Sequence, residues 1–211
     1  MNSRESVGPD APQPITGTIL ITGGAGFVGR NLVEALGARP IRVLVRDTRR
    51  AAKLLGSNIE LFEGDVTRPE TLHGAMGGVA AVIHLVAIIS EAGSATFGSV
   101  IRQGTVNVVA EAKHSGVSRF LHMSALGARN DPRFGYFEAK WQAEKAVEKS
   151  SMNWTIFRPS VIFGPGDEFI NTLAGLVKTA PVIPIVGNGR TRFQPVAVTD
   201  VAAAFVQALD D

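Results

Sequence analysis

Six short apolar runs recur along this chain, and each is separated from the next by a segment long enough for a helix. The runs cover residues 18–22, 42–45, 59–62, 81–86, 120–123 and 155–157. Alternation of strands and helices predicts an α/β fold with a doubly wound parallel sheet. Residues 82–86 read Val-Ile-His-Leu-Val, which is typical of a strand covered by helices on both faces.

A glycine-rich turn follows the first run. Residues 22–29 read Thr-Gly-Gly-Ala-Gly-Phe-Val-Gly, and apolar residues continue at helical spacing to Leu36. In such a unit the first glycine permits a tight turn, the second lets backbone amides approach a pyrophosphate, and the third lets the helix pack on the strand. This pattern predicts a Rossmann-type, dinucleotide-binding domain. The expected cofactor contacts are Gly23, Gly26, Phe27, Val28 and Gly29.

The end of the second run bears on which dinucleotide is bound. Arg46 follows residues 42–45, and Arg49 and Arg50 come soon after. An arginine here can pair with the 2′-phosphate of NADP(H), whereas an acidic residue would bind the ribose hydroxyls of NAD(H). We therefore predict a preference for NADP(H). A shift of one position would place Asp47 in the ribose role and restore NAD(H).

Two further runs end in candidate cofactor contacts. Asp65 and Val66 follow the third run, where a carboxylate can recognise the adenine amino group or can serve as a turn or cap residue before Pro69. His84 lies inside the fourth run and is expected to be a hydrogen-bonded core residue. Open α/β sheets bind ligands at the carboxyl ends of their strands. At that end of the fourth run lie Leu85, Val86 and Ala87.

The only tyrosine, Tyr136, precedes Lys140 by four residues on a helix predicted over residues 136–149. Residues i and i+4 share one helix face, so the ammonium can lower the pKa of the phenol from about 10 and make it a general acid or base. The lysine can also hold the nicotinamide ribose. Ser124, after the fifth run, is a candidate to bind a substrate carbonyl, or it is only a turn residue. Its neighbour Met123 is expected to contact the cofactor.

Composition narrows the function classes. The chain has 211 residues, 45% hydrophobic and 19% charged, which fits one globular domain. A formal charge of +2 gives no argument for nucleic-acid binding. The absence of cysteine excludes disulfides and thiolate catalysis and removes the usual zinc ligands, and we expect no metal site.

The organisation along the chain is expected to be a disordered leader over 1–15, a nucleotide-binding domain over 16–165, and a substrate-side region over 166–211 that returns to the core. The leader contains three prolines and lacks the pattern of a signal peptide. The longest apolar stretch, residues 79–89, is too short to span a membrane. A cytoplasmic location is the expectation.

These residues, in this order, resemble the short-chain dehydrogenase/reductase superfamily, in the extended or atypical branch that includes NAD-dependent epimerase/dehydratase-like proteins. Within it the chain is similar to the group related to the nucleotide-binding accessory subunit of respiratory complex I. The resemblance covers residues 18–209 and is most specific at 22–29, 82–87, 136–140, 157–166 and 192–196. It implies that Pro159, Ser160 and Val161 contact the nicotinamide end, and that residues 192–196 belong to the substrate side.

The resemblance also implies the activity and the partners. It implies an NADP-dependent oxidoreductase or epimerase/dehydratase acting on a small molecule, and alternatively a non-catalytic NADPH-binding structural or assembly protein. Partners would be a second copy, through helices 99–113 and 136–149, or a respiratory complex. Family members continue past residue 211, so the substrate domain is expected to be truncated. They also carry a longer serine-rich turn, which leaves the catalytic position on Ser124 or Ala125.

Overall fold

The computed structural model describes residues 15–56, 59–167, 169–179, 190 and 192–211. The prediction of a disordered leader falls almost entirely on residues 1–14, which lie outside this set. Residues 180–189, part of the expected substrate-side region, lie outside it as well.

One parallel sheet of six strands forms the centre of the described chain. Its strands are β1 (Thr18–Thr22), β2 (Ile41–Val45), β3 (Glu60–Glu63), β4 (Val79–His84), β5 (Arg119–Met123) and β6 (Asn153–Phe157). They lie in the order β3-β2-β1-β4-β5-β6 and every neighbouring pair is parallel. The predicted α/β, doubly wound, Rossmann-type fold is therefore confirmed.

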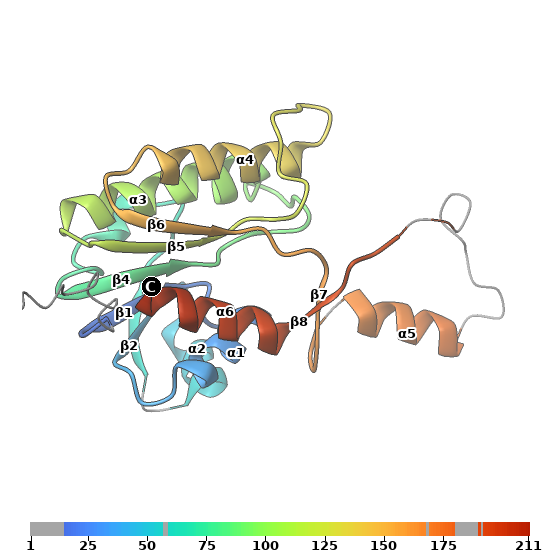
Figure 1. Cartoon of the computed structure of the whole chain (residues 1–211), viewed down its shortest axis with the longest axis horizontal. Coiled ribbons are helices and arrows are strands. Elements are labelled where there is room, and N and C mark those ends of the chain that lie inside the picture. The colour runs from blue at the N-terminus through green and yellow to red at the C-terminus, as the bar shows by residue number, and fades with distance from the viewer. Residues whose placement is uncertain (1–14, 57–58, 168, 180–189, 191) are drawn as a thin grey trace, which may run out of the picture.

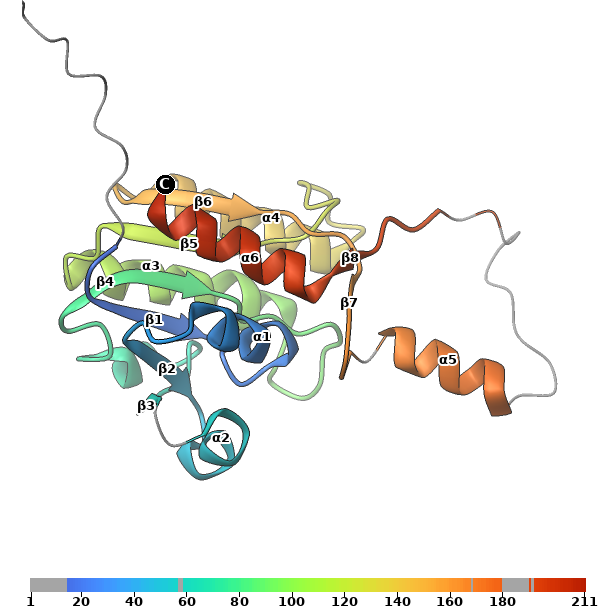
Figure 2. The same ribbon diagram turned by 60° about the horizontal axis from the view of Figure 1, so that its bottom comes forward.

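Helices cover both faces of this sheet (Figures 1 and 2). One face carries α1 (Phe27–Leu36), α2 (Thr48–Leu55) and α6 (Val198–Asp210). The other carries the short 3-10 helix η1 (Pro69–Leu72), the π-helix η2 (Phe97–Gln103), α3 (Gly104–His114) and α4 (Gly135–Glu148). The two layers explain why the strands read as continuous apolar runs.

Alternation along each strand divides the core in two. Ile19 and Ile21 on β1 pack with α1 and α6, whereas Leu20 between them packs with the α3 side. All three are fully buried. Because successive strand side chains point to opposite faces, one strand supplies both cores.

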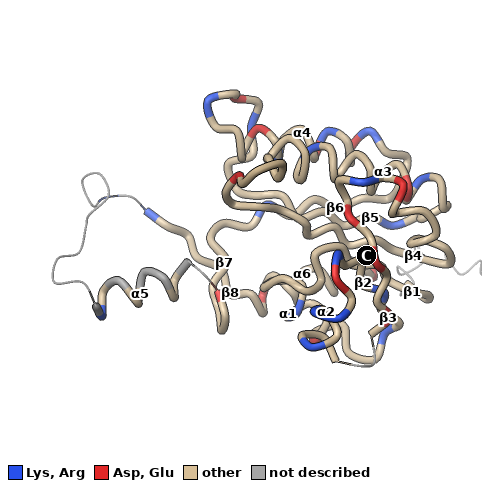
Figure 3. The backbone as a smooth tube through the Cα atoms, turned by 180° about the vertical axis from the view of Figure 1, so that it is seen from behind, with Lys and Arg blue, Asp and Glu red and all other residues tan. Residues whose placement is uncertain are grey.

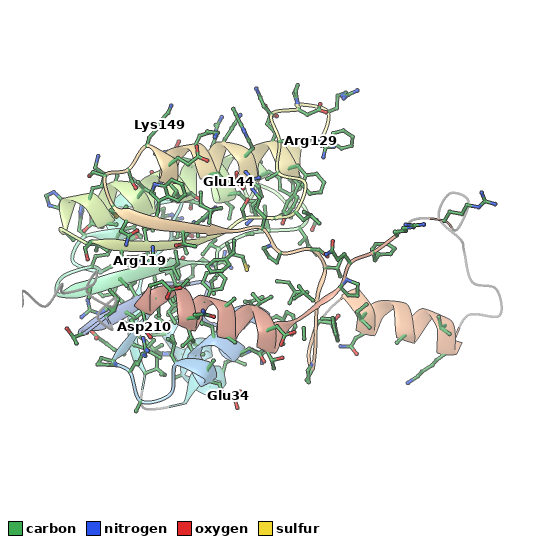
Figure 4. All side chains as sticks on the ribbon, viewed as in Figure 1. Glu34, Arg119, Arg129, Glu144, Lys149 and Asp210 are labelled. Atoms are coloured by element: carbon green, nitrogen blue, oxygen red, sulfur yellow. The ribbon has the colours of Figure 1, made fainter. Side chains whose placement is uncertain are left out.

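The last helix closes the α1 face. Arg119, on β5, donates to Thr155 Oγ1 at 2.7 Å and to the carbonyl oxygen of Ala208 on α6. Asp210 pairs with Arg39 at 2.6 Å and also accepts from the backbone N–H of Ile15. These bonds tie the end of α6 to segments far away in the sequence, and Figure 4 shows Arg119 and Asp210 at the same end of the molecule.

A small second sheet extends from the first. Strands β7 (Ile162–Phe163) and β8 (Val196–Ala197) pair in parallel, and α5 (Phe169–Thr179) lies beyond them, away from the six-stranded sheet (Figure 1). None of the helices in the described segments has the length and apolar character needed to cross a membrane.

Two predicted boundaries are wrong. The strand predicted over residues 81–86 ends at His84. The N–H of Leu85 still donates to the carbonyl of Thr22, and the chain then leaves the sheet. The helix expected from Ser99 begins instead at Phe97 as a π-helix, and only continues as α3 from Gly104. A reciprocal capping box between Thr96 and Ser99 fixes this start, since each side chain accepts the other's backbone N–H.

Candidate functional site

The glycine-rich turn connects β1 to α1, and its glycines are sterically required. Gly23 has a φ of 78°, and a Cβ there would lie 3.2 Å from the backbone of Leu85. A Cβ on Gly29 would lie 2.3 Å from the carbonyl oxygen of Gly23. The contact at Gly29 is too short for any side chain, and at Gly23 the positive φ favours glycine. The first and third glycines therefore occupy the positions that the sequence pattern predicts.

The amino end of α1 is open to an anion. The N-cap residue Gly26 is exposed and offers no side-chain cap, and no acidic residue lies in the first turn. Phe27 and Val28 begin the helix, so their backbone N–H groups belong to the first turn, which has no intrahelical acceptors. Such a helix end favours a phosphate group.

Arg46 is exposed immediately after β2, as predicted. Asp47 is the N-cap of α2, where its Oδ1 accepts the backbone N–H of Arg50 at 2.9 Å. One carboxylate oxygen of the alternative ribose ligand is thus already engaged. Lys and Arg positions mark α2 in Figure 3, and this concentration of cations favours a phosphorylated ligand.

Asp65 forms a turn after β3. Its Oδ1 accepts both the backbone N–H and the hydroxyl of Thr67, each at 2.8 Å. This geometry supports the turn interpretation. The neighbouring Val66 is buried, and its carbonyl accepts from Asn107 on α3 at 2.8 Å. Val66 therefore packs between the turn and α3.

The residues after β4 lie beside the glycine turn. Leu85 is buried, Val86 is half-buried and Ala87 is exposed. His84, the last strand residue, is fully buried between the hydroxyls of Thr22 (2.6 Å) and Thr105 (2.9 Å). Thr105 donates its own hydroxyl hydrogen to the carbonyl of Ile101, so it accepts from His84 Nε2, and Nδ1 accepts from Thr22. Burial lowers the pKa of His84 to about 3, as expected for a neutral core residue.

Tyr136 lies in the first turn of α4 and is half-buried. Its ring makes edge-on contacts with Phe97 on η2 (5.7 Å) and Phe137 (5.3 Å). Burial raises the pKa of the phenol. This direction is opposite to the lowering that we expected from Lys140, because burial disfavours the charged phenolate.

Lys140 is almost completely buried one turn further along α4. Its Nζ donates to the carbonyl oxygen of Met123, at the end of β5, at 2.8 Å. Burial lowers the pKa of Lys140 to about 8, and the opposing charge of Glu144 raises it. The lysine therefore joins α4 to the carboxyl end of the central strands.

Ser124 directly follows Met123 and is buried, with its backbone N–H bonded to the carbonyl of Phe157 at 2.7 Å. Its hydroxyl has no hydrogen-bond partner within the described residues. The alternative position, Ala125, is half-buried and has no polar side-chain atom. Of the two, only Ser124 can offer a hydroxyl to a carbonyl.

The segment after β6 passes over this edge. Pro159 accepts the backbone N–H of Leu126 at 2.8 Å, and Val161 accepts that of Val196 at 3.0 Å. The Ser160 hydroxyl donates to the carbonyl of Gln194. These bonds hold the segment between the β5 loop and β8, where the substrate-side region begins.

Sequence reasoning missed two polar groups around Lys140. Glu144 is completely buried on α4, where its carboxylate is bonded by Arg158. His122, on β5, is also completely buried and stacks on His84 with ring centroids 5.4 Å apart. Glu144 could have been identified from the sequence, because an acidic residue four positions after Lys140 lies on the same helix face. The sequence carries no comparable sign for His122, because its burial follows from the packing of α4.

A groove of about 420 Å³ lies elsewhere, between α3 and the end of α4. It contains none of the predicted cofactor or catalytic residues. Its lining comes from the two helices expected to pair with a second copy, namely Val106, Val109, Ala110, Lys113, Ala146, Lys149 and Ser150. Association through these helices stays a prediction.

The residues present fit a dinucleotide. The glycine turn leaves space that side chains would fill, and the first turn of α1 presents backbone donors. Lys140 and Ser124 both lie at the carboxyl end of β5. A model built on known members of the NAD(P)H-binding family matches residues 23–211. The chain belongs to this NAD(P)H-binding family. The match begins at the first glycine of the turn and includes α4 and α6.

The curated relatives of this chain have different functions. This chain is 33% identical to NADH dehydrogenase (ubiquinone) 1 alpha subcomplex subunit 9, mitochondrial, of Arabidopsis thaliana, with 90% of this chain and 50% of the relative aligned. It is 34% identical to the ceramide reductase of Caulobacter vibrioides, over 90% of this chain and 60% of the relative. The chain thus spans between half and three fifths of these two proteins.

Solved structures support the fold. The dTDP-glucose 4,6-dehydratase of Streptomyces venezuelae, with NAD bound, superposes with a TM-score of 0.78 at 20% identity, over 92% of this chain and 72% of the other. This likeness confirms the predicted fold, while the match over residues 23–211 confirms membership of an NAD(P)H-binding family.

Proposed function

We propose that this protein is an NADP(H)-dependent oxidoreductase in which Tyr136 and Lys140 form the proton-transfer pair. The observation that carries the proposal is the bond from Lys140 Nζ to the Met123 carbonyl, which holds Lys140 at the carboxyl end of β5, at the edge of the sheet where the glycine turn also lies. An epimerase or dehydratase would use the same pair, because both reactions begin with the same oxidation step.

Each residue of the candidate site would have a separate role in binding the cofactor or transferring the proton. The amides of the glycine turn and α1 bind the pyrophosphate, and Arg46 pairs with the 2′-phosphate. Bound NADP(H) supplies or accepts the hydride. Lys140 holds the nicotinamide ribose and stabilises the Tyr136 phenolate, Tyr136 gives or takes the substrate proton at its hydroxyl, and Ser124 donates a hydrogen bond to the substrate oxygen.

An apolar substrate fits the surroundings of this edge. Large apolar side chains are exposed after β4, after β5 and on β7, namely Ile89 (79% exposed), Leu126 (53%) and Phe163 (39%). The ceramide reductase relative is named for a lipid. We propose a ketone or secondary alcohol on a lipid-like body as the substrate class.

A second candidate is a non-catalytic NADPH-binding protein that works within a respiratory assembly. The similarity to the NADH dehydrogenase subunit favours it, and so does the raised pKa of the Tyr136 phenol, which disfavours the phenolate. In that case the cofactor would stabilise the fold without turnover.

Substitution of the pair distinguishes the two candidates. Tyr136→Phe keeps the ring and removes the hydroxyl, so oxidation of NADPH by a long-chain ketone probe should fall roughly 10² to 10⁴-fold with little change in NADPH affinity. Lys140→Met should reduce both, since the ammonium serves ribose binding as well.

Tyr136 is the only tyrosine, so its ionisation can be followed by absorbance without a competing phenol. Enzyme function requires the pKa of the phenol to fall when NADP⁺ is added. A phenol that still titrates at about 10 or above in the complex, with both variants equally stabilised by NADPH, would contradict catalysis and support the binding protein.

A further inference from the structure

A buried carboxylate lies one turn beyond Lys140 on α4. Glu144 is 0% exposed, and Figure 4 places it on the side of α4 that faces the sheet. Its Oε1 accepts from Arg158 Nε at 2.8 Å, and its Oε2 accepts from Arg158 Nη2. Arg158 follows β6 directly and precedes Pro159. The ion pair therefore links the helix that carries Tyr136 to the segment predicted to contact the nicotinamide end.

Glu144 is also the anion that balances Lys140. The titratable and charged groups around this lysine are Tyr136 and Glu144 on α4, His84 on β4, His122 on β5, and Arg158 beyond Glu144. Burial lowers the pKa of both histidines far below 6.5, so they are neutral. Among these groups in the described chain, Glu144 is the only carboxylate.

We propose that Glu144 is a positioning residue, whose buried carboxylate keeps Lys140 charged and directed at the Met123 carbonyl, while Arg158 couples this lysine to residues 159–161. The catalytic meaning of this arrangement rests on the proposed function, but the charge relation itself does not.

The physical reason is the low dielectric around α4. An ammonium removed from water loses its proton more readily unless an opposite charge stays near it. Glu144 is four residues away on the same helix face, which is within the range of such support. Arg158 bonds both oxygens of Glu144, so the buried carboxylate has charge-assisted partners without a bond from Lys140.

The competing explanation is that Glu144 only fastens Arg158 to α4. Three variants separate the two explanations. Glu144→Gln removes the charge and keeps the shape, and Arg158→Met breaks the ion pair but leaves the carboxylate. Glu148→Gln removes a carboxylate one turn further along, where Glu148 is paired with Lys145 and is partly exposed.

The first measurement is NMR titration of ¹⁵N-labelled lysine side chains in the whole protein without cofactor, with Lys140→Met used for assignment. We expect Glu144→Gln to lower the pKa of Lys140 by about one unit or more, and Glu148→Gln and Arg158→Met not to lower it. An unchanged pKa in Glu144→Gln, or an equal fall in Arg158→Met, would overturn the proposal.

The second measurement is NADPH affinity across pH. At about pH 8, where Lys140 of the unmodified protein is about half protonated, a fall of one pKa unit should make Glu144→Gln bind NADPH about fivefold more weakly. The variant should recover at about pH 6, where Lys140 regains its proton. A loss of affinity that does not recover at low pH would indicate a structural role instead. Failure of the unmodified protein to bind NADPH would remove the proposed function, while the NMR result would still decide the role of Glu144.

Folding of the variants is checked by circular dichroism. If Glu144→Gln does not fold, the double variant Glu144→Gln/Arg158→Met avoids leaving a guanidinium without its partner. Compared with Arg158→Met alone, it differs only in the carboxylate. The same fall in the pKa of Lys140 is expected in that comparison, and its absence would overturn the proposal.

Discussion

Lys140 and Tyr136 stand on neighbouring turns of one helix, and burial moves their pKa values in opposite directions. The pKa of the lysine falls to about 8 and that of the phenol rises. In both cases burial disfavours the charged form. Spacing alone showed that the two share a helix face, but spacing says nothing about desolvation. Under the proposed function, proton transfer by Tyr136 would depend on Lys140 retaining its charge, and we assign to Glu144 the role of maintaining that charge.

At the residue scale, Arg46 is predicted to set the choice of cofactor. Arg46→Asp removes a charge-assisted contact to the 2′-phosphate, which should cost about 1.5–3 kcal/mol of binding free energy. NADPH affinity should therefore fall more than about tenfold by calorimetry, with NADH affinity little changed. Lys53→Asp, an exposed charge reversal at the other end of α2, is the matched control. Tighter binding of NADH than of NADPH by the unmodified protein would refute this assignment.

Among the elements, the unit β1–turn–α1 agrees best with its sequence pattern. The predicted strand 18–22 coincides with β1, and Gly23 and Gly29 stand where side chains would collide with backbone. Local sequence is sufficient here, because the turn bonds to itself: Gly26 N–H donates to the Gly23 carbonyl at 3.0 Å.

Gly29→Ala tests this element. The added Cβ would lie 2.3 Å from the Gly23 carbonyl oxygen, so the helix must shift away from the turn. We expect a loss of about 1–3 kcal/mol in the free energy of unfolding, measured by denaturant titration, together with weaker NADPH binding. Gly77→Ala serves as the control, because its Cβ would meet nothing closer than 3.6 Å. Equal stability of the two variants would show that the turn is not closely packed.

At the scale of the whole molecule, two histidines that must stay neutral are buried beneath the α3 and α4 layer. His84 and His122 lie side by side on β4 and β5, both completely buried. His84 has two hydroxyl partners, whereas His122 has none within the described residues. Protonation of either ring would place a second cation beside Lys140.

Global stability should therefore depend on pH. The pKa of His84 in the folded protein is about 3, and that of His122 is also far below the unfolded value of 6.5, so below 6.5 the unfolded chain binds more protons. Above about pH 6.5 the two histidines make their full contribution to the free energy of unfolding. As pH falls below that value this contribution is lost, by about 1.4 kcal/mol per pH unit for each histidine. His122→Leu should remove one histidine's share of this slope between about pH 6.5 and 5, measured by denaturant unfolding. His114→Gln, at an exposed site, should leave the slope unchanged. An identical slope in His122→Leu would contradict the argument.

The fold and part of the site were thus accessible from sequence. Strand positions, the two-faced sheet and the location of Arg46 follow from local periodicity and spacing. The start of α3 was missed, because the π-helix depends on the side-chain bonds of Thr96 and Ser99. The sequence leaves both interpretations of Asp65 open, and its bonds to Thr67 favour the turn.

The sequence by itself determined the alternation of strands and helices, the glycine turn and the Tyr136–Lys140 spacing, because these depend on residues close together in the chain. Only the tertiary structure decided which polar groups lose their water. Lys140 donates to Met123, Arg158 donates to Glu144, and His84 lies between the hydroxyls of Thr22 and Thr105. Each of these hydrogen bonds joins residues of different strands, helices or loops. Charge states at this edge of the sheet depend on burial and on partners from distant segments, and a linear pattern specifies neither.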